Sequence, residues 1–455
     1  MALTAPQQAF RSDVPALGPE RSVVWPRRLR QRLSNGLEVV LVESHSIPKF
    51  TAQLFFRSGN ADTVPGLAEM TATVARTGTS RRASRQIEDD LRKWGADLST
   101  GAGADNTAIS FSGLTEFSAP LLDLVAEIGR EASFPAAEFE RERHQKLEEL
   151  NIDRTTPNFL AAERIRGVLF GAHPYASFAP TKEQVEGYTR DALVQFYREH
   201  YQPSDGLLVA VGDFAPDAML AQIERTLGTW TGVAPPHSPR PAPPTHRGRR
   251  VFLVHLAGAV QTDILLGNLA ITRKHPDWLR AGLANNIYGG AFHSRLVMNI
   301  REKRGYTYSP RSGIVALREY GFFHVHAAVR NEVVAATLTE IFYELDRLRA
   351  LPVEQAELDN ALSYMSGVFS LGLGTQEGIA GQLATAYLEG LPEDYLERYR
   401  DRVRALKAGD VLEAARRYFD SADAQIVVVG DRQAIAEQAA LFGEVEVYDP
   451  LGNRL

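Results

Sequence analysis

Two stretches of this 455-residue chain repeat one pattern, RDALVQFYREHYQPSDGLLVAVGD at residues 190–213 and GDVLEAARRYFDSADAQIVVVGD at residues 409–431. Each is typical of an amphipathic helix, a polar turn, a short apolar strand and a Gly-Asp stop. The two stops, at Gly212 and Gly430, lie 218 positions apart. The sequence therefore predicts an internal duplication, with two halves of the same fold.

The stretch between the two halves is rich in proline. GVAPPHSPRPAPPTHRGRR, at residues 232–250, carries six prolines between Pro235 and Pro244. Proline lacks the backbone donor that sheets and helices need, so it favours an extended spacer. We therefore expect an N-terminal domain at residues 1–232, a linker at 233–249 and a C-terminal domain at 250–455. This division also suits the length, which exceeds the usual size of a single hydrophobic core.

The remaining pattern places strands and helices in the same order in both halves. Runs rich in Val, Ile and Phe predict strands, and apolar residues at helical spacing predict long helices. The strands are expected at residues 37–43, 51–56, 250–256 and 261–271, and the helices at 117–128, 139–152, 333–348 and 354–369. Because strands come in neighbouring pairs and helices in runs, the pattern favours an α+β fold. Its sheets are expected to be mixed or antiparallel, with helices packed on one side.

Composition excludes several classes of function. The net charge of −6 comes from intermixed acidic and basic residues, without the long basic run that nucleic-acid binding requires. The absence of cysteine excludes disulfides, thiolate zinc clusters and thiol nucleophiles. No apolar run approaches the roughly 20 residues of a membrane span. The start, MALTAPQQAFRSDVPALGPE, lacks the regions of a signal peptide but also fits a processed start, so cytoplasm and periplasm are both expected compartments.

Local motifs point to a known family. NGLEVVLVES at residues 35–44, FGAHPYA at 170–176 and the two Gly-Asp strand ends resemble the pitrilysin/insulinase superfamily of inverted-motif zinc peptidases. The resemblance covers nearly the whole chain, together with its duplication and its spacer. It implies a clamshell of two homologous domains. In catalytic members, a helix after a Gly-Leu pair carries H-x-x-E-H, whose histidines bind zinc and whose glutamate is the general base.

The matching stretch here, GLAEMTATVARTGTS at residues 66–80, lacks that motif. Its three motif positions hold Glu69, Ala72 and Thr73, so both histidines and the base are missing. The spacing of the third family ligand falls on Glu149, next to Glu148, and the alternative is that both line a solvated helix face. One carboxylate cannot hold zinc, which takes four ligands, or three and water. We therefore expect no metal in this chain.

The second half carries the strongest motif, IYGGAFHSRLVMNIREKRGYTYSP at residues 287–310. It resembles the family segment in which an Arg and a Tyr reach the zinc site, and this implies catalytic roles for Arg301 and Tyr308. A guanidinium can bind the carbonyls of a peptide, and a phenol can donate to an oxyanion. Gly289 and Gly290 are expected to let a substrate backbone approach closely. The alternative is a charged helix end capped by Gly305.

Other candidates are weaker. The spacing of His324 and His326 on one strand face suits a metal, but no third ligand is visible and strand packing is the favoured interpretation. His173 precedes a proline and is expected to order a turn. The glycines of SLGLGT at residues 370–375, Gly372 and Gly374, lack a phosphate-loop lysine and indicate a helix boundary.

Two functions from different classes follow from the resemblance. In the first, the chain is the non-metal subunit of a heterodimeric zinc endopeptidase, similar to mitochondrial processing peptidase subunits and bacterial heterodimeric homologues. Zinc is then expected in a homologous partner subunit, and peptides are the substrates. In the second, the chain is an inert structural subunit of a larger complex. The presence of both Arg301 and Tyr308 favours the first, while an autonomous peptidase requires zinc ligands that the sequence does not show.

Overall fold

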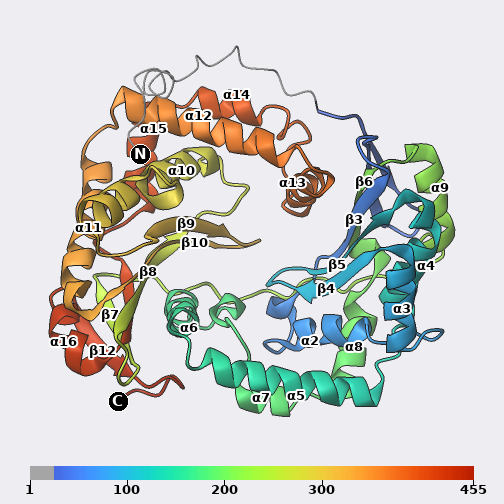
Figure 1. Ribbon diagram of the computed structural model, residues 1–455, viewed down its shortest axis with the longest axis horizontal. Coiled ribbons are helices and arrows are strands. Elements are labelled where there is room, and N and C mark those ends of the chain that lie inside the picture. Colours follow the sequence, from blue (N-terminus) through green and yellow to red (C-terminus); the bar gives the residue numbers. More distant parts are fainter. Residues whose placement is uncertain (1–24) are drawn as a thin grey trace, which may run out of the picture.

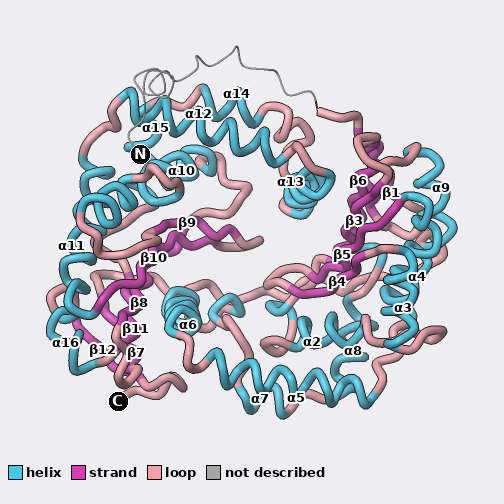
Figure 2. Tube along the Cα trace, viewed as in Figure 1, coloured by secondary structure: helices cyan, strands magenta, loops and turns pink. Residues whose placement is uncertain are grey.

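The computed structural model describes residues 25–455. Its strands form two six-stranded sheets, gathered at opposite sides of the molecule (Figures 1 and 2). The sheet of the first half has the order β1 (Arg28–Arg32), β2 (Glu38–Glu43), β6 (Gly206–Gly212), β3 (Lys49–Phe56), β5 (Thr107–Leu114), β4 (Asp97–Ala102). The sheet of the second half has the order β12 (Glu444–Tyr448), β7 (Arg250–His255), β11 (Gln425–Gly430), β8 (Gln261–Ala270), β10 (Gly321–Arg330), β9 (Arg311–Ala316).

Five strands of each sheet correspond in order and direction. β6 pairs parallel with β2 and antiparallel with β3, and β11 pairs in the same way with β7 and β8. β5 and β4 then continue antiparallel, as do β10 and β9. The predicted duplication and the mixed α+β fold are therefore confirmed. Only the outer edge differs, because β1 runs antiparallel to β2 whereas β12 runs parallel to β7.

The two central strands explain the repeated apolar runs. Every residue of β6 and β11 is buried, because each strand has a neighbour on both sides and covered faces. The Gly-Asp stop has a steric reason at Gly212, where an added Cβ atom would lie 2.4 Å from the Cβ atom of Phe50. In the second half, Asp431 then caps the next helix, accepting from the Gln433 backbone N–H at 2.9 Å.

The helices of both halves follow the same order. Those of the first half are α2 (Leu67–Ala75), α3 (Ser84–Trp94), α4 (Ser118–Glu131), α5 (Ala136–Asp153), α6 (Pro157–Phe170), α7 (Lys182–Glu186), α8 (Arg190–His200) and α9 (Pro216–Thr226). Those of the second are α10 (Trp278–Asn285), α11 (Val334–Ala350), α12 (Gln355–Gly372), α13 (Gln376–Leu388), α14 (Tyr399–Arg404), α15 (Ala408–Tyr418) and α16 (Arg432–Ala440). The four long helices predicted from periodicity are confirmed as α4, α5, α11 and α12. Within residues 25–455, none of the helices is long and apolar enough to cross a membrane.

Each half gives one helix to the sheet of the other half. α6 packs on β8 and β11 of the second sheet, and α13 packs on β6 and β3 of the first (Figure 1). Buried residues of α6, such as Ile165 and Leu169, share a core with Leu265 and Val427. Each sheet is therefore covered on one face by helices of its own half and on the other by a helix from its counterpart. This exchange joins the two halves through apolar contacts.

A buried charge cluster also joins the halves. Arg240 of the Pro-rich stretch has a side chain only 4% exposed, and its guanidinium lies 2.6 Å from Asp62 and 3.3 Å from Asp105 of the first half. It also lies 2.8 Å from Glu319, which precedes β10 in the second half. Tyr175 donates to Asp105 at 2.6 Å. Although residues 231–249 form no helix or strand, one of their side chains is an internal ion-pair partner.

Candidate functional site

The positions that match the zinc motif lie on α2, but their side chains have other contacts. The Glu69 carboxylate accepts the backbone N–H of Ala102, at the end of β4, with a distance of 2.5 Å. Thr73 donates its hydroxyl to the Glu69 carbonyl oxygen at 3.0 Å. Ala72 is fully buried and has no side-chain donor atom. Helix and edge strand are thus tied together at the position where the resemblance places a metal in catalytic relatives.

The carboxylates of α5 complete no metal site. Glu149 has a side chain 48% exposed and lies 3.1 Å from the ammonium of Lys146 one turn earlier on the same helix. Glu148 beside it is also exposed, so the solvated helix face considered for this pair is what the structure has. Within residues 25–455, no group of three or more His, Cys, Asp or Glu side chains is arranged to hold a metal. The residues at the motif positions do not fit zinc, which needs at least three protein ligands.

The segment with the strong second-half motif has an unusual backbone. Two π-helices, η5 (Asn286–Gly290) and η6 (Val297–Lys303), flank a short loop. π-Helical turns account for well under 1% of residues in globular proteins, and they occur frequently at functional sites. Two of them within eighteen residues mark this segment as a candidate site on backbone geometry alone.

Arg301 and Tyr308 are brought together at this segment. The Arg301 guanidinium carbon lies 4.5 Å from the centre of the Tyr308 ring and 4.9 Å from that of Phe292. A carboxylate oxygen of Glu302 lies 3.2 Å from the Nε atom of Arg301. Tyr308 is 78% exposed and Phe292 58% exposed, so the guanidinium contacts two rings that face solvent. Within residues 25–455, the Tyr308 hydroxyl has no hydrogen-bond partner, and it remains available to a bound molecule.

Phe292 is the member of this group that sequence reasoning missed. Its signal in the sequence was an aromatic residue directly after the glycine pair of this motif, and the structure shows that its ring is exposed. The glycines before it have a packing reason. A Cβ atom on Gly289 would lie 2.5 Å from the Ser312 hydroxyl of β9, and one on Gly290 would lie 2.7 Å from the Asn285 amide nitrogen. Their expected contact with substrate stays a prediction.

Polar contacts fix the segment to the helices behind it. Arg295 forms two hydrogen bonds of 2.7 Å with the carboxylate of Glu357 on α12. Asn299 of η6 donates to Glu344 of α11 at 2.9 Å, and both residues are buried. Such bidentate and buried contacts hold side chains in one geometry. The loop that carries Phe292 is therefore a positioned element.

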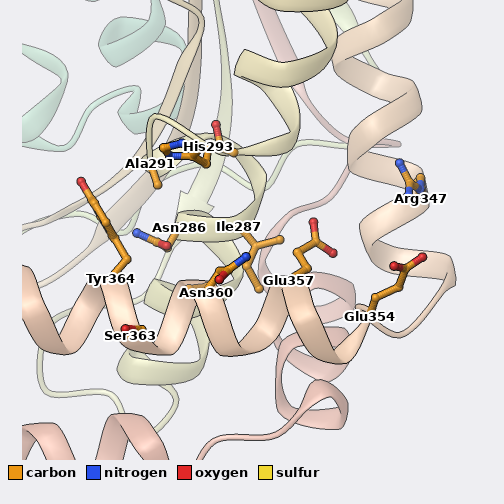
Figure 3. Close-up of a pocket in the computed structure, with 12 residues that line it drawn as sticks. Asn286, Ile287, Ala291, His293, Arg347, Glu354, Glu357, Asn360, Ser363 and Tyr364 are labelled. Atoms are coloured by element: carbon orange, nitrogen blue, oxygen red, sulfur yellow. The ribbon is translucent and has the colours of Figure 1, made fainter. Parts of the chain in front are cut away.

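A pocket of about 720 Å³ lies between η5 and α12. Figure 3 shows Glu354, Glu357 and Arg347 at one end of this pocket and Tyr364 at the other. A second pocket of about 530 Å³ adjoins it and extends along η6. The two share His293, Arg347 and Glu357 as lining residues, so they form one continuous hollow beside the motif.

The weaker candidates have structural contacts. His326 of β10 is buried and its Nε2 atom lies 2.9 Å from Asp263 on β8. His324, on the same face, has its pKa lowered to about 4 by burial. His173 accepts the Tyr175 backbone N–H at 3.1 Å and orders the turn η3 (Pro174–Ala176). α12 ends at Gly372, which confirms the predicted helix boundary.

Comparison with known proteins agrees with the fold and the motifs. The family model described as insulinase (peptidase family M16) matches residues 38–172, and that described as the peptidase M16 inactive domain matches residues 187–365. An uncharacterized zinc protease of Streptomyces coelicolor is 24% identical over 85% of this chain and 86% of its own. Another, from Bacillus subtilis, is 21% identical over 76% of this chain and 84% of its own.

Solved structures share the whole architecture. The crystal structure of a peptidase M16 inactive domain from Pseudomonas fluorescens has a TM-score of 0.82 and 26% identity, covering 89% of this chain and 98% of that one. A protease from Helicobacter pylori has the same fold, with a TM-score of 0.84, 20% identity, and coverage of 89% and 99%. Because two models of one family together cover more than two thirds of the chain and these relatives span most of it, the chain belongs to the insulinase family of peptidases, peptidase family M16.

Proposed function

We propose that this chain is the non-metal subunit of a two-chain zinc endopeptidase and that it contributes Arg301 and Tyr308 to the active site of a zinc-bearing homologous partner. One observation carries the proposal. The Arg301 guanidinium is stacked on Tyr308, whose hydroxyl has no partner within residues 25–455. A purely structural subunit has no chemical need for an exposed phenol and a guanidinium held together on a π-helical segment.

The chemistry of the pair suits peptide hydrolysis. As a peptide carbonyl is attacked, its oxygen becomes negatively charged, and a phenol donor placed at that oxygen stabilises the charge. The Arg301 guanidinium offers donors in a fixed plane for the carbonyl oxygens of an extended peptide. Its Nε atom faces Glu302, and its ring contacts hold the guanidinium plane. In this proposal, Tyr308 acts on the transition state and Arg301 on the bound chain.

The side chains of the first half support the placement of the metal in the partner. A metal site needs side chains with ligand atoms, and Ala72 has none. The side chains of Glu69 and Thr73 form hydrogen bonds within the fold instead. The metal is therefore proposed for the partner, and the first half of this chain for structural support and pairing. Subunits of this size are expected to bury more than the ~1,000 Å² of a credible biological interface.

Reconstitution tests the proposal. The purified chain is expected to contain no stoichiometric zinc by elemental analysis and to cleave no quenched fluorescent peptide. Co-expression with a homologue from the same genome that carries H-x-x-E-H is expected to give a one-to-one complex by size-exclusion chromatography, with chelator-sensitive cleavage. An Arg301→Ala/Tyr308→Phe double variant should assemble with unchanged zinc content and lose most of this activity.

The contrary outcomes are specific. One tightly bound zinc per isolated chain would show that the metal assignment is wrong. Failure of every such homologue to co-elute with the chain would remove the heterodimer. Full activity of a complex that contains the double variant would favour the alternative function, an inert structural subunit, because its one chemical motif would then have no consequence.

A further inference from the structure

The larger pocket, beside η5, lies at an equivalent place to the motif position of the first half. In the first half, α2 follows β3 and faces α5, the helix before the exchanged helix α6. In the second half, α10 and η5 follow β8 and face α12, the helix before the exchanged helix α13. The pocket opens between η5 and α12. The duplication therefore places this hollow at the position in the second half that corresponds to the space between α2 and α5 in the first.

This pocket is lined by polar groups, and one of them is buried without a hydrogen-bond partner in the described part of the chain. Ser294 lines it and is only 2% exposed, and its hydroxyl has no hydrogen-bond partner within residues 25–455. A buried hydroxyl without a partner costs free energy, so such a group indicates a missing contact. Asn286 of η5 and Asn360 and Ser363 of α12 supply further uncharged donors and acceptors (Figure 3). The lining suits a polar chain with amide groups.

The charges of the lining do not cancel. Glu357 is neutralised by the two hydrogen bonds from Arg295, and Arg347 lies 3.3 Å from Glu344. Glu354, at the same end of the pocket, forms no ion pair within 4 Å among residues 25–455, and the charged group that acts on it is the more distant Arg295. Once these two ion pairs are counted, the lining has one more negative than positive charge, and the unpaired carboxylate lies at the end away from Tyr364 (Figure 3).

We propose that the pocket between η5 and α12 binds a cationic group of a peptide, an ammonium or guanidinium that pairs with Glu354 while neighbouring backbone contacts Ser294 and Asn360. This rests on the proposed function for its substrate, a peptide. The loop between the π-helices links the two sites, because Phe292 contacts Arg301 and its neighbours His293 and Ser294 line the pocket. The cation has two sources in a peptide, a basic side chain or the N-terminal amine.

Peptide binding to the full chain alone tests this without any cleavage. The probes are fluorescein-labelled ten-residue peptides that differ at one central position, lysine or its uncharged isostere norleucine, with an acetylated N-terminus. A third peptide has norleucine and a free N-terminal amine, with the label on its C-terminal end. By fluorescence anisotropy at low salt, one of the cationic peptides should bind about tenfold more tightly than the acetylated norleucine peptide, as a charged hydrogen bond typically contributes.

Two variants that each remove one negative charge, one inside the pocket and one outside it, make the test specific. Glu354→Gln should remove the preference for the cationic peptide. Asp359→Asn removes the same charge from an exposed position of α12 outside the pocket and should leave the preference intact. Ser294→Ala should weaken the binding of all three peptides by a similar factor, because it removes a contact to the peptide backbone. Melting temperatures of the three variants should show that each is folded.

The outcomes distinguish a basic side chain from the N-terminal amine as the bound cation. They also distinguish failure of the pocket proposal from failure of the proposed function. Preference only for the free-amine peptide identifies the N-terminus as the bound group, and preference for the lysine peptide identifies a side chain. Equal binding of all three peptides, or equal effects of Glu354→Gln and Asp359→Asn, would overturn the inference. If the reconstituted complex cleaves peptides while Glu354→Gln changes neither binding nor preference, this inference fails and the proposed function stands.

Discussion

The Arg301 guanidinium carbon lies 4.5 Å from the centre of the Tyr308 ring, so two side chains seven positions apart are already paired in the isolated chain. The pairing follows from backbone geometry. η6 ends at Lys303, Gly305 takes a positive φ of 64°, and the chain returns so that Tyr308 covers Arg301. Gly305 therefore does cap a helix end, as the structural interpretation of this motif expected, and the same turn sets the distance between the two predicted catalytic residues.

Tyr308→Phe keeps the ring and its contact with Arg301 but removes the hydroxyl. In the complex with a zinc-bearing homologue, we expect kcat to fall by roughly 10²-fold to 10³-fold, as loss of an oxyanion donor typically causes. Assembly and zinc content should be unchanged. Steady-state kinetics on complexes of verified stoichiometry measure this, and a kcat within threefold of wild type would exclude an oxyanion role.

In the proposed role, Arg301→Ala would remove contacts that are made to the peptide in both the ground state and the transition state. We expect kcat/KM to fall with the larger share in KM, because uniform binding is lost. Arg301→Lys should resemble the alanine variant, since lysine keeps the charge but lacks the planar fork and its ring stacking. Normal KM values for the lysine variant would show that charge alone matters at this position.

Phe292→Ala removes one of the two rings around the guanidinium. An exposed cation–π contact contributes about 0.5–1 kcal/mol, so kcat/KM should fall by about two- to fivefold through poorer positioning of Arg301. Met298→Ala is the matched control, because Met298 is also half exposed in this segment and makes no ring contact with Arg301. Equal losses in the two variants would contradict the positioning role.

Arg240→Met keeps the apolar stem but leaves Asp62 and Asp105 without their cation. Both carboxylates are largely buried, so the free energy of unfolding should fall by about 3 kcal/mol, as when one partner of a buried ion pair is removed. Arg247→Met is the control, since that side chain is 84% exposed and its pair with Asp423 spans 3.5 Å. It should change stability by less than about 0.5 kcal/mol in urea unfolding. A similar effect in both would mean that the buried cluster adds nothing.

His324 predicts a pH dependence of stability. Burial lowers its pKa to about 4, with help from the nearby charges of Arg311 and Arg166. Between about pH 6.5 and 4, the unfolded chain binds a proton at this residue that the folded chain does not. The contribution of His324 to the free energy of unfolding is therefore complete above about pH 6.5 and is lost as the pH falls toward 4. At pH 5 the loss is about 2 kcal/mol.

His324→Phe should reduce that loss. Urea unfolding at pH 7.5 and pH 5 measures it, and His144→Gln, at an exposed position of α5, is the control. The fall in stability between the two pH values should be smaller in His324→Phe than in either wild type or the control. An unchanged fall would show that His324 does not titrate differently on folding.

Much of the fold could be predicted because its signals are local. The continuous apolar runs of β6 and β11 reflect strands buried on both faces, and the Gly-Asp stops reflect steric contact at Gly212. The exchange of α6 and α13 could not be predicted. A helix's apolar face shows that it is buried, but not which of two similar sheets covers it.

The sequence by itself determined the duplication and the absence of H-x-x-E-H from residues 66–80, and it supplied Arg301 and Tyr308 as the predicted catalytic pair, because residue types and their spacing along the chain carry this information. Only the tertiary structure decided that Glu69 ties α2 to β4, that Phe292 joins the Arg301 contact, and that Arg240 of the predicted spacer is buried. The physical reason is that these contacts join residues distant in sequence, or residues of a π-helical turn, and the packing of whole sheets and helices sets their distances.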